Sequence, residues 1–144
     1  MFENGVDDIK FGETISSIDF LRYLNWSDKT ILLIEDDEAS ALLITEFLKC
    51  TQVKLIHVSN KNSLYLREKP HIDLIIKGML CNEFFTDFEL LKQIKTKYVN
   101  TPIIACSATV SEIGIKTCYK AGCDVFVTKP VDLNLLVNIL TTYI

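Results

Sequence analysis

A cluster of four acidic residues follows a short apolar run in the first third of the chain. The run Ile31–Ile34 leads directly into Glu35, Asp36, Asp37 and Glu38. Carboxylates this close repel one another unless a cation lies among them, and Mg²⁺ is the cation usually held by small sites lined with oxygen atoms. The cluster therefore indicates either a magnesium pocket or a solvated turn whose acids favour the start of a helix.

Two further polar positions follow apolar runs later in the chain. Ser107 comes after the run Pro102–Cys106, and its hydroxyl group could bind a phosphoryl oxygen. Lys129 lies shortly after the run Asp124–Val127, where its ammonium group could pair with the acids or with a phosphoryl group. Pro130 follows Lys129 and is a candidate for a cis peptide bond that directs the lysine.

These positions need elements that bring distant parts of the chain together. From residue 30 onward, short apolar runs alternate with longer segments of helical period. Runs that are apolar on consecutive residues are typical of strands buried on both faces of a parallel sheet. We predict strands at Ile31–Ile34, Val53–Val58, Asp73–Ile76, Pro102–Cys106 and Asp124–Val127, and helices at Ala39–Lys49, Asn62–Glu68, Phe85–Tyr98, Val110–Ala121 and Leu133–Thr142.

This alternation predicts an α/β fold, a doubly wound parallel sheet of five strands with helices on both faces. Gly122 is expected to end the fourth of these helices. In such sheets, polar chemistry collects at the carboxyl ends of the strands. The acids, Ser107 and Lys129 all follow predicted strands, so we expect them at that edge.

Residues 1–28 do not follow the alternation, whereas residues 29–144 are expected to form one domain. The stretch FGETISSIDFLRYLNW could hold one short amphipathic helix, capped by Ser16 or Ser17. We interpret residues 1–28 as a linker partly packed on the domain. The alternative is a coupling or dimerisation element anchored by Trp26.

Composition narrows the class of protein. Of the 144 residues, 49% are hydrophobic, which is enough for a core, and the formal net charge is −4. This charge argues against nucleic acid and anionic membranes as partners. The acidic N-terminus does not resemble a secretory signal, and no apolar run approaches the roughly 18 residues of a membrane span. We interpret the five cysteines as reduced core thiols of a cytoplasmic protein, not as a metal site.

Three stretches together resemble the receiver domain of response regulators. KTILLIEDDEAS is similar to the opening of that family, PIIACSA to its fourth strand, and AGCDVFVTKPVDLNLL to its close. The resemblance covers residues 29–144, and WSDKTILLIEDD is especially similar to receiver units of hybrid sensor kinases. It implies a flavodoxin-like (βα)5 fold with strand order 2-1-3-4-5.

The resemblance also implies roles for single residues. Glu35 and Asp36 match the acid pair that holds Mg²⁺, and Ser107 matches the hydroxyl that senses the phosphoryl group. Lys129 matches the lysine that pairs with that group, and Phe126 matches the switch aromatic, with plain core packing as its alternative. The family's usual docking face would here comprise Val110–Ala121, Phe126 and Leu133–Tyr143.

The family's phosphorylated aspartate has no counterpart in this sequence. The third strand of the family ends in Asp-Leu-Ile-Ile-x-Asp, whereas this chain has DLIIKG, which places Gly78 at the acceptor position. Counting backwards from the following helix gives Met79, and neither of these residues nor Lys77 is an acid. Strand alternation is expected to point Lys77 away from the pocket, with the alternative that its side chain turns toward the pocket and assists there. Gly78 could simply ease a turn. Loss of one anionic ligand predicts weak Mg²⁺ binding, with Lys129 as an internal counter-ion to Glu35 and Asp36.

The leading hypothesis is a non-enzymatic pseudo-receiver of a two-component phosphorelay. It needs no cofactor and acts by docking to a protein partner: a histidine kinase, a phosphotransfer protein or an output protein. One alternative is a working phosphoacceptor that uses a displaced acid, Glu83 or Asp87, although displacement costs the geometric advantage of the reaction. The other is a small α/β enzyme of another class, for which we find no glycine-rich phosphate loop and no nucleophile elbow.

Overall fold

The chain folds around one parallel sheet. The computed structural model describes residues 17–66, 70–79, 84–108 and 111–144. Its sheet has five strands in the order β2-β1-β3-β4-β5, all neighbours being parallel. The strands are β1 (Thr30–Ile34), β2 (Lys54–Val58), β3 (Leu74–Met79), β4 (Ile103–Ser107) and β5 (Val125–Thr128). The predicted flavodoxin-like sheet and its strand order 2-1-3-4-5 are confirmed.

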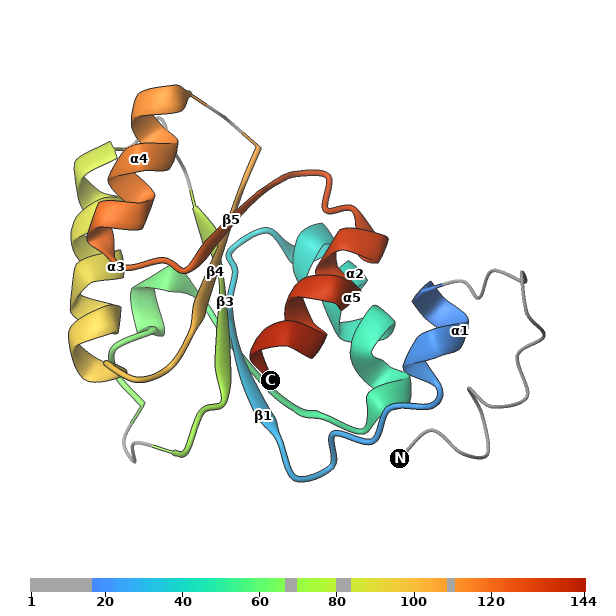
Figure 1. Cartoon of the computed structure of the whole chain (residues 1–144). Helices are drawn as coiled ribbons and strands as arrows, with labels where there is room; N and C mark the ends of the chain where they lie inside the picture. The colour runs from blue at the N-terminus through green and yellow to red at the C-terminus, as the bar shows by residue number, and fades with distance from the viewer. Residues whose placement is uncertain (1–16, 67–69, 80–83, 109–110) are drawn as a thin grey trace.

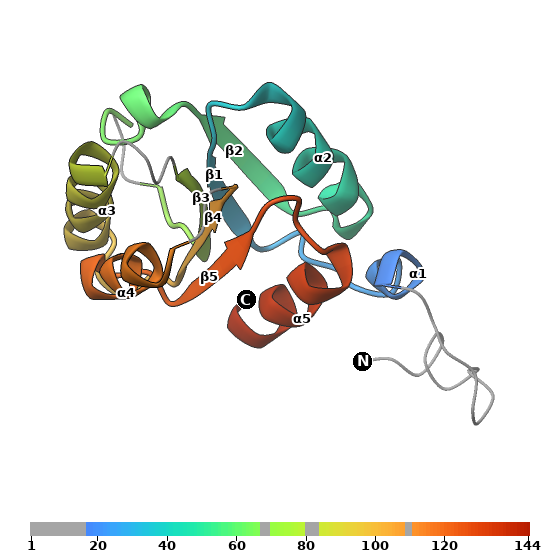
Figure 2. The ribbon, with the colours of Figure 1, turned by 90° about the horizontal axis from the view of Figure 1, so that it is seen from above.

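Helices cover both faces of this sheet (Figures 1 and 2). On one face lie α1 (Ser17–Leu21), α2 (Glu38–Leu48) and α5 (Leu133–Tyr143), and on the other lie α3 (Phe84–Lys97) and α4 (Glu112–Ala121). Each face buries its own hydrophobic cluster against the sheet. Alternate residues of β3 belong to different clusters: Leu74 and Ile76 to the first, Ile75 and Met79 to the second.

The helix predicted at Asn62–Glu68 is wrong. In the described part of that segment, the chain forms only a short 3₁₀ turn, η2 (Asn60–Asn62). The Ser59 hydroxyl accepts from the backbone N–H of Asn62, and the Ser63 hydroxyl donates to the Asn60 carbonyl oxygen. Ser and Asn side chains that bond to the nearby backbone in this way compete with a regular helix.

Strand β3 is longer than its sequence pattern predicts. It continues past Ile76 through Lys77, Gly78 and Met79, which pair with Ala105, Cys106 and Ser107 of β4. Gly78 therefore lies within a paired strand and does not form a turn. The reason for a glycine at this position lies in the packing of the site and not in a turn.

Part of the N-terminal extension packs into the first hydrophobic cluster. Leu21 is fully buried and Trp26 is only 8% exposed, with both side chains in the cluster that also contains residues of α2 and α5. The backbone N–H of Trp26 donates to the Thr51 carbonyl oxygen at 2.8 Å. Trp26 thus anchors residues of its own chain and is not an exposed anchor for a partner.

Smaller features agree with the sequence in part. Gly122 ends α4 with a φ of +122°, as predicted. Cys106, Cys118 and Cys123 are buried free thiols, whereas Cys50 is exposed and Cys81 lies outside the described residues. Among the residues that the structure describes, no helix is both long and apolar enough to cross a membrane.

Candidate functional site

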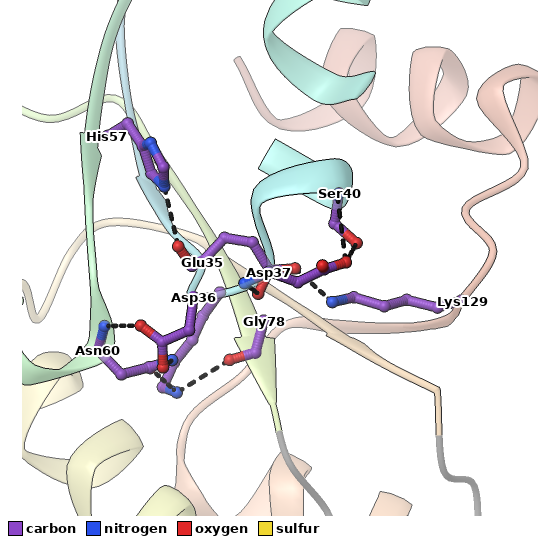
Figure 3. A network of polar contacts seen from close by, with 9 residues as sticks. Glu35, Asp36, Asp37, Ser40, His57, Asn60, Gly78 and Lys129 are labelled. Carbon is purple, nitrogen blue, oxygen red and sulfur yellow. Dashed lines mark hydrogen bonds and ion pairs between the residues drawn. The ribbon is translucent and has the colours of Figure 1, made fainter. Parts of the chain in front are cut away.

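The carboxyl ends of β1, β3, β4 and β5 bring the predicted site residues to one edge of the sheet. Residues at these ends are in register: Ile34 pairs with Lys77, and Gly78 pairs with Cys106. Glu35 follows Ile34 directly, so its side chain lies next to Gly78. Figure 3 shows Glu35, Gly78 and Lys129 close together at this edge.

The carboxylate of Glu35 fills the place that a side chain at position 78 would take. A Cβ atom built on Gly78 would lie 2.0 Å from Glu35 Oε2, 2.5 Å from Cδ and 2.7 Å from Oε1. Atoms cannot approach this closely, and Glu35 is itself only 6% exposed. Gly78 is therefore the residue that faces the acids, whereas Met79 packs into the second hydrophobic cluster.

Lys129 forms an ion pair with Glu35, as the sequence analysis predicts. Its backbone N–H donates to the Ser107 carbonyl oxygen at 2.8 Å, which joins the ends of β4 and β5. The Lys129–Pro130 peptide bond is cis. Because both charged groups of the pair are mostly buried, removal of either one would leave an uncompensated charge.

Asp36 is engaged by Asn60, a residue that the sequence analysis did not identify. The Asn60 backbone N–H donates to Asp36 Oδ1 and its side-chain amide donates to Oδ2, both at 2.8 Å. Asn60 Oδ1 in turn accepts from the ammonium group of Lys77 at 2.6 Å. Asn60 follows β2, whose end lies at the same edge, and this position is the signal that could have revealed it.

Lys77 departs from the expectation that it points away from the pocket. Its side chain does start from the face of β3 opposite to Gly78, as strand alternation requires. Its four-carbon stem, however, brings the ammonium group back to the edge, where it donates to Asn60 and, at 3.2 Å, to the Gly78 carbonyl oxygen. Alternation gives the direction of the Cβ atom and not the reach of a lysine.

The neighbouring acid Asp37 has a structural role. It caps the N-terminus of α2 by accepting from the Ser40 backbone N–H at 3.2 Å. Hydrogen bonds from the side chain and backbone of Ser40 lower the pKa of Asp37. The His57 ring, which the sequence analysis also did not assign, contacts the Glu35 carbonyl oxygen at 2.8 Å.

Ser107 and Phe126 lie where the resemblance places them. Ser107 is buried at the end of β4, and Phe126 is half-buried in β5 against the second cluster. The Phe126 backbone N–H donates to the Tyr119 hydroxyl of α4 at 3.2 Å. Beside Ser107, burial raises the pKa of the Cys106 thiol to about 12, so this cysteine is an inert core residue.

The oxygen atoms of this edge do not fit a tightly bound divalent ion. Mg²⁺ demands near-octahedral coordination by oxygen atoms that are free to bind it. Both Asp36 oxygens accept from Asn60, Glu35 Oε1 is paired with Lys129, and Gly78 contributes no carboxylate. Within the described ranges, no group of three or more His, Cys, Asp and Glu side chains is arranged to hold a metal ion.

Glu83 and Asp87 are the two acids considered as displaced phosphoacceptors, and the structure describes only Asp87. It is buried in the first turn of α3, and Glu83 lies outside the described residues. Because α3 packs on the second cluster, Asp87 lies on the side of the sheet covered by α3 and α4. Gly78 faces the other cluster, so Asp87 does not replace the missing carboxylate at position 78.

Comparison with known proteins agrees with this fold. The sequence profile of the response regulator receiver domain matches residues 31–141. A cyclic di-GMP phosphodiesterase of Thermotoga maritima is 28% identical over 111 residues, which cover 74% of this chain but only 28% of that protein.

Solved structures share this fold. A response regulator from Thermotoga maritima superposes with a TM-score of 0.71 at 19% identity, covering 80% of this chain and 96% of that one. A response regulator receiver domain from Francisella has a TM-score of 0.65 at 27% identity, covering 79% and 97%. Since the family profile spans most of the sequence, this chain belongs to the response regulator receiver domain family.

Proposed function

We propose that this receiver domain signals by docking to a protein partner and is not itself phosphorylated. The observation that carries the proposal is the Glu35 carboxylate in the side-chain space of Gly78, paired with Lys129. An aspartyl phosphate needs a carboxylate nucleophile held against a metal ion. Position 78 has no carboxylate, and the space for one is filled.

The ion pair between Glu35 and Lys129 supports the proposal that the domain is held in one conformation. Glu35 occupies Lys129, the lysine that the family uses for the phosphoryl group, and so provides a permanent anionic partner for it. Ser107 lies at the end of β4, and Phe126 lies in the neighbouring strand β5. A fixed charge pair of this kind leaves no step for a phosphoryl group to control.

Exposed apolar side chains support docking through the face formed by α4, β5 and α5. Ile113 is 78% exposed, and three more side chains on α4 and α5 are also exposed: Tyr119, Leu135 and Tyr143. Exposed apolar side chains on these two helices are available for contact with a protein partner. By this proposal, the partner is a histidine kinase, a phosphotransfer protein or an output protein.

Incubation with acetyl phosphate and Mg²⁺, followed by intact-mass measurement, tests the absence of phosphorylation. We expect no stable adduct of about 80 Da under conditions in which a receiver with an intact aspartate is modified. A stable adduct would contradict the proposal. The variants Asp87→Asn and Glu83→Gln would then show whether a displaced acid accepts the group.

Capture from the native host tests the docking face. Wild type and Leu42→Glu, a change of an exposed residue on α2 outside the face, are expected to retain a two-component partner, and Ile113→Glu is expected to lose it. A kinase or phosphotransfer protein that binds Ile113→Glu as well as wild type would contradict docking through this face.

A further inference from the structure

Lys77 is a charged residue in a position that normally holds an apolar side chain. It lies within β3, the strand paired on both sides, and its exposed fraction is 0%. Removal of an ammonium group from water is costly unless polar and charged groups surround it. The role of Lys77 therefore depends on the polar and charged groups around its ammonium group.

The contacts of the ammonium group join three strand ends. It donates to the Gly78 carbonyl oxygen of β3 at 3.2 Å and to Asn60 Oδ1, beyond β2, at 2.6 Å. The other end of the Asn60 amide donates to Asp36, which follows β1 (Figure 3). The Asn60 amide is thus aligned between a cation and a carboxylate, so its dipole couples the two charges.

Three carboxylates balance the buried charge. Burial lowers the pKa of Lys77, and Asp87 opposes this effect most strongly, with further contributions from Asp36 and Glu35. Two of these three carboxylates, Glu35 and Asp36, are the acids that the resemblance assigns to Mg²⁺. A lysine of the same chain therefore provides positive charge to the acid pair.

We infer that the Lys77 ammonium group is a built-in cation that takes the place of a divalent metal ion at the acidic edge. It holds the ends of β1, β2 and β3 together through Asn60, while Lys129 neutralises Glu35. The receiver is consequently independent of metal. This inference does not rest on the docking proposal, because it concerns the charge balance of the edge alone.

Metal titration of the intact chain tests this inference. Melting temperature is measured with MgCl₂ and with NaCl at matched ionic strength, and Mn²⁺ is added to follow paramagnetic broadening of the Asp36, Asn60 and Gly78 amide resonances. Wild type is expected to show no Mg²⁺-specific shift and no saturable broadening. Lys77→Met, which keeps the length of the stem and removes the charge, is expected to show both. At about ten times its dissociation constant, Mg²⁺ should raise the melting temperature of this variant by about 4 °C.

Lys92→Met is the matched control, because Lys92 is an exposed lysine of α3 that pairs with Glu89 and lies outside this edge. It removes the same charge and should behave like wild type. If Lys77→Met does not fold, Asn60→Ala replaces it, since this change separates Asp36 from the ammonium group and should also produce a metal response. Saturable metal binding by wild type would overturn the inference. A folded Lys77→Met or Asn60→Ala variant that shows no metal response would overturn it as well. Neither outcome depends on the acetyl phosphate experiment.

Discussion

At the scale of single residues, the site is defined by the absence of a side chain at Gly78 and by the Glu35 carboxylate that fills this space. A glycine at the end of a strand is usually explained by its backbone freedom, yet Gly78 lies within a paired strand. Its value is the absence of a Cβ atom, because the Glu35 carboxylate needs that space. The glycine at position 78 and the Glu35–Lys129 ion pair are therefore two sides of one packing arrangement.

Gly78→Ala tests this arrangement directly. The added methyl group would displace Glu35 from Lys129, so we expect a loss of about 1–3 kcal/mol in the free energy of unfolding. In a Glu35→Ala background the space is open, and the same change should be neutral or stabilising, by about 0.5 kcal/mol, because alanine restricts the unfolded chain. Urea denaturation of the four proteins in this double-mutant cycle measures the difference. Equal effects of Gly78→Ala in both backgrounds would show that Glu35 does not occupy the space.

At the scale of elements, a polar side chain in the loop before each of three helices caps the N-terminus of that helix by hydrogen bonding to its backbone. Asp37 begins α2, Ser111 begins α4 and Asp132 begins α5, each by accepting a hydrogen bond from the first turn. The cap on α2 matters most for the site, because it fixes the chain directly after Glu35 and Asp36. This cap also uses a charged acceptor, which makes it dependent on pH.

The stability provided by Asp37 should disappear in acid. Since the Ser40 hydrogen bonds lower its pKa from the ordinary value of 3.8, the stabilisation is complete above that value and is lost as the pH falls through the lower pKa of the folded state. We expect Asp37→Ala to have a lower urea midpoint than wild type at neutral pH, and the difference to shrink below the ordinary pKa. Ser111→Ala removes an uncharged cap, so its effect should not follow pH in this way. A difference for Asp37→Ala that stays constant in acid would contradict a charged cap.

Prediction of elements from sequence was accurate where apolar periodicity was strong and failed where polar residues decided the conformation. The strands and the four helices α2, α3, α4 and α5 follow the expected order. The central strands β1, β3 and β4 are buried on both sheet faces, which favours continuous apolar runs. The sequence pattern favours a helix after β2, but Ser59 and Ser63 bond to the local backbone and form a turn. The pattern also ends β3 too early, because Lys77 and Gly78 are not typical strand residues, although β4 pairs with them.

At the scale of the whole molecule, residues ahead of the sheet are part of the first hydrophobic cluster. Leu21 and Trp26 are buried beside residues of α2 and α5. The segment from Ser17 onward therefore contributes to stability and does not act only as a linker.

Trp26→Ala should destabilise the whole domain. Removal of this buried indole is expected to cost about 3–5 kcal/mol of unfolding free energy, because it leaves a large cavity in the core. Tyr23→Ala, a change at an exposed aromatic of the same segment, should stay within about 0.5 kcal/mol of wild type. Chemical denaturation followed by circular dichroism measures both variants, and similar small effects would mean that the segment is not part of the cooperative core.

The amino-acid sequence by itself determined the parallel sheet, the edge where the polar residues meet and the absence of a carboxylate at position 78. Apolar periodicity dictates which segments are buried, and no fold can supply a side chain that position 78 lacks. Only the tertiary structure decided that Glu35 fills this gap and that the Lys77 ammonium group reaches Asp36 through Asn60. Those contacts depend on side-chain lengths and on neighbours from separate strands, which meet only once the sheet has formed.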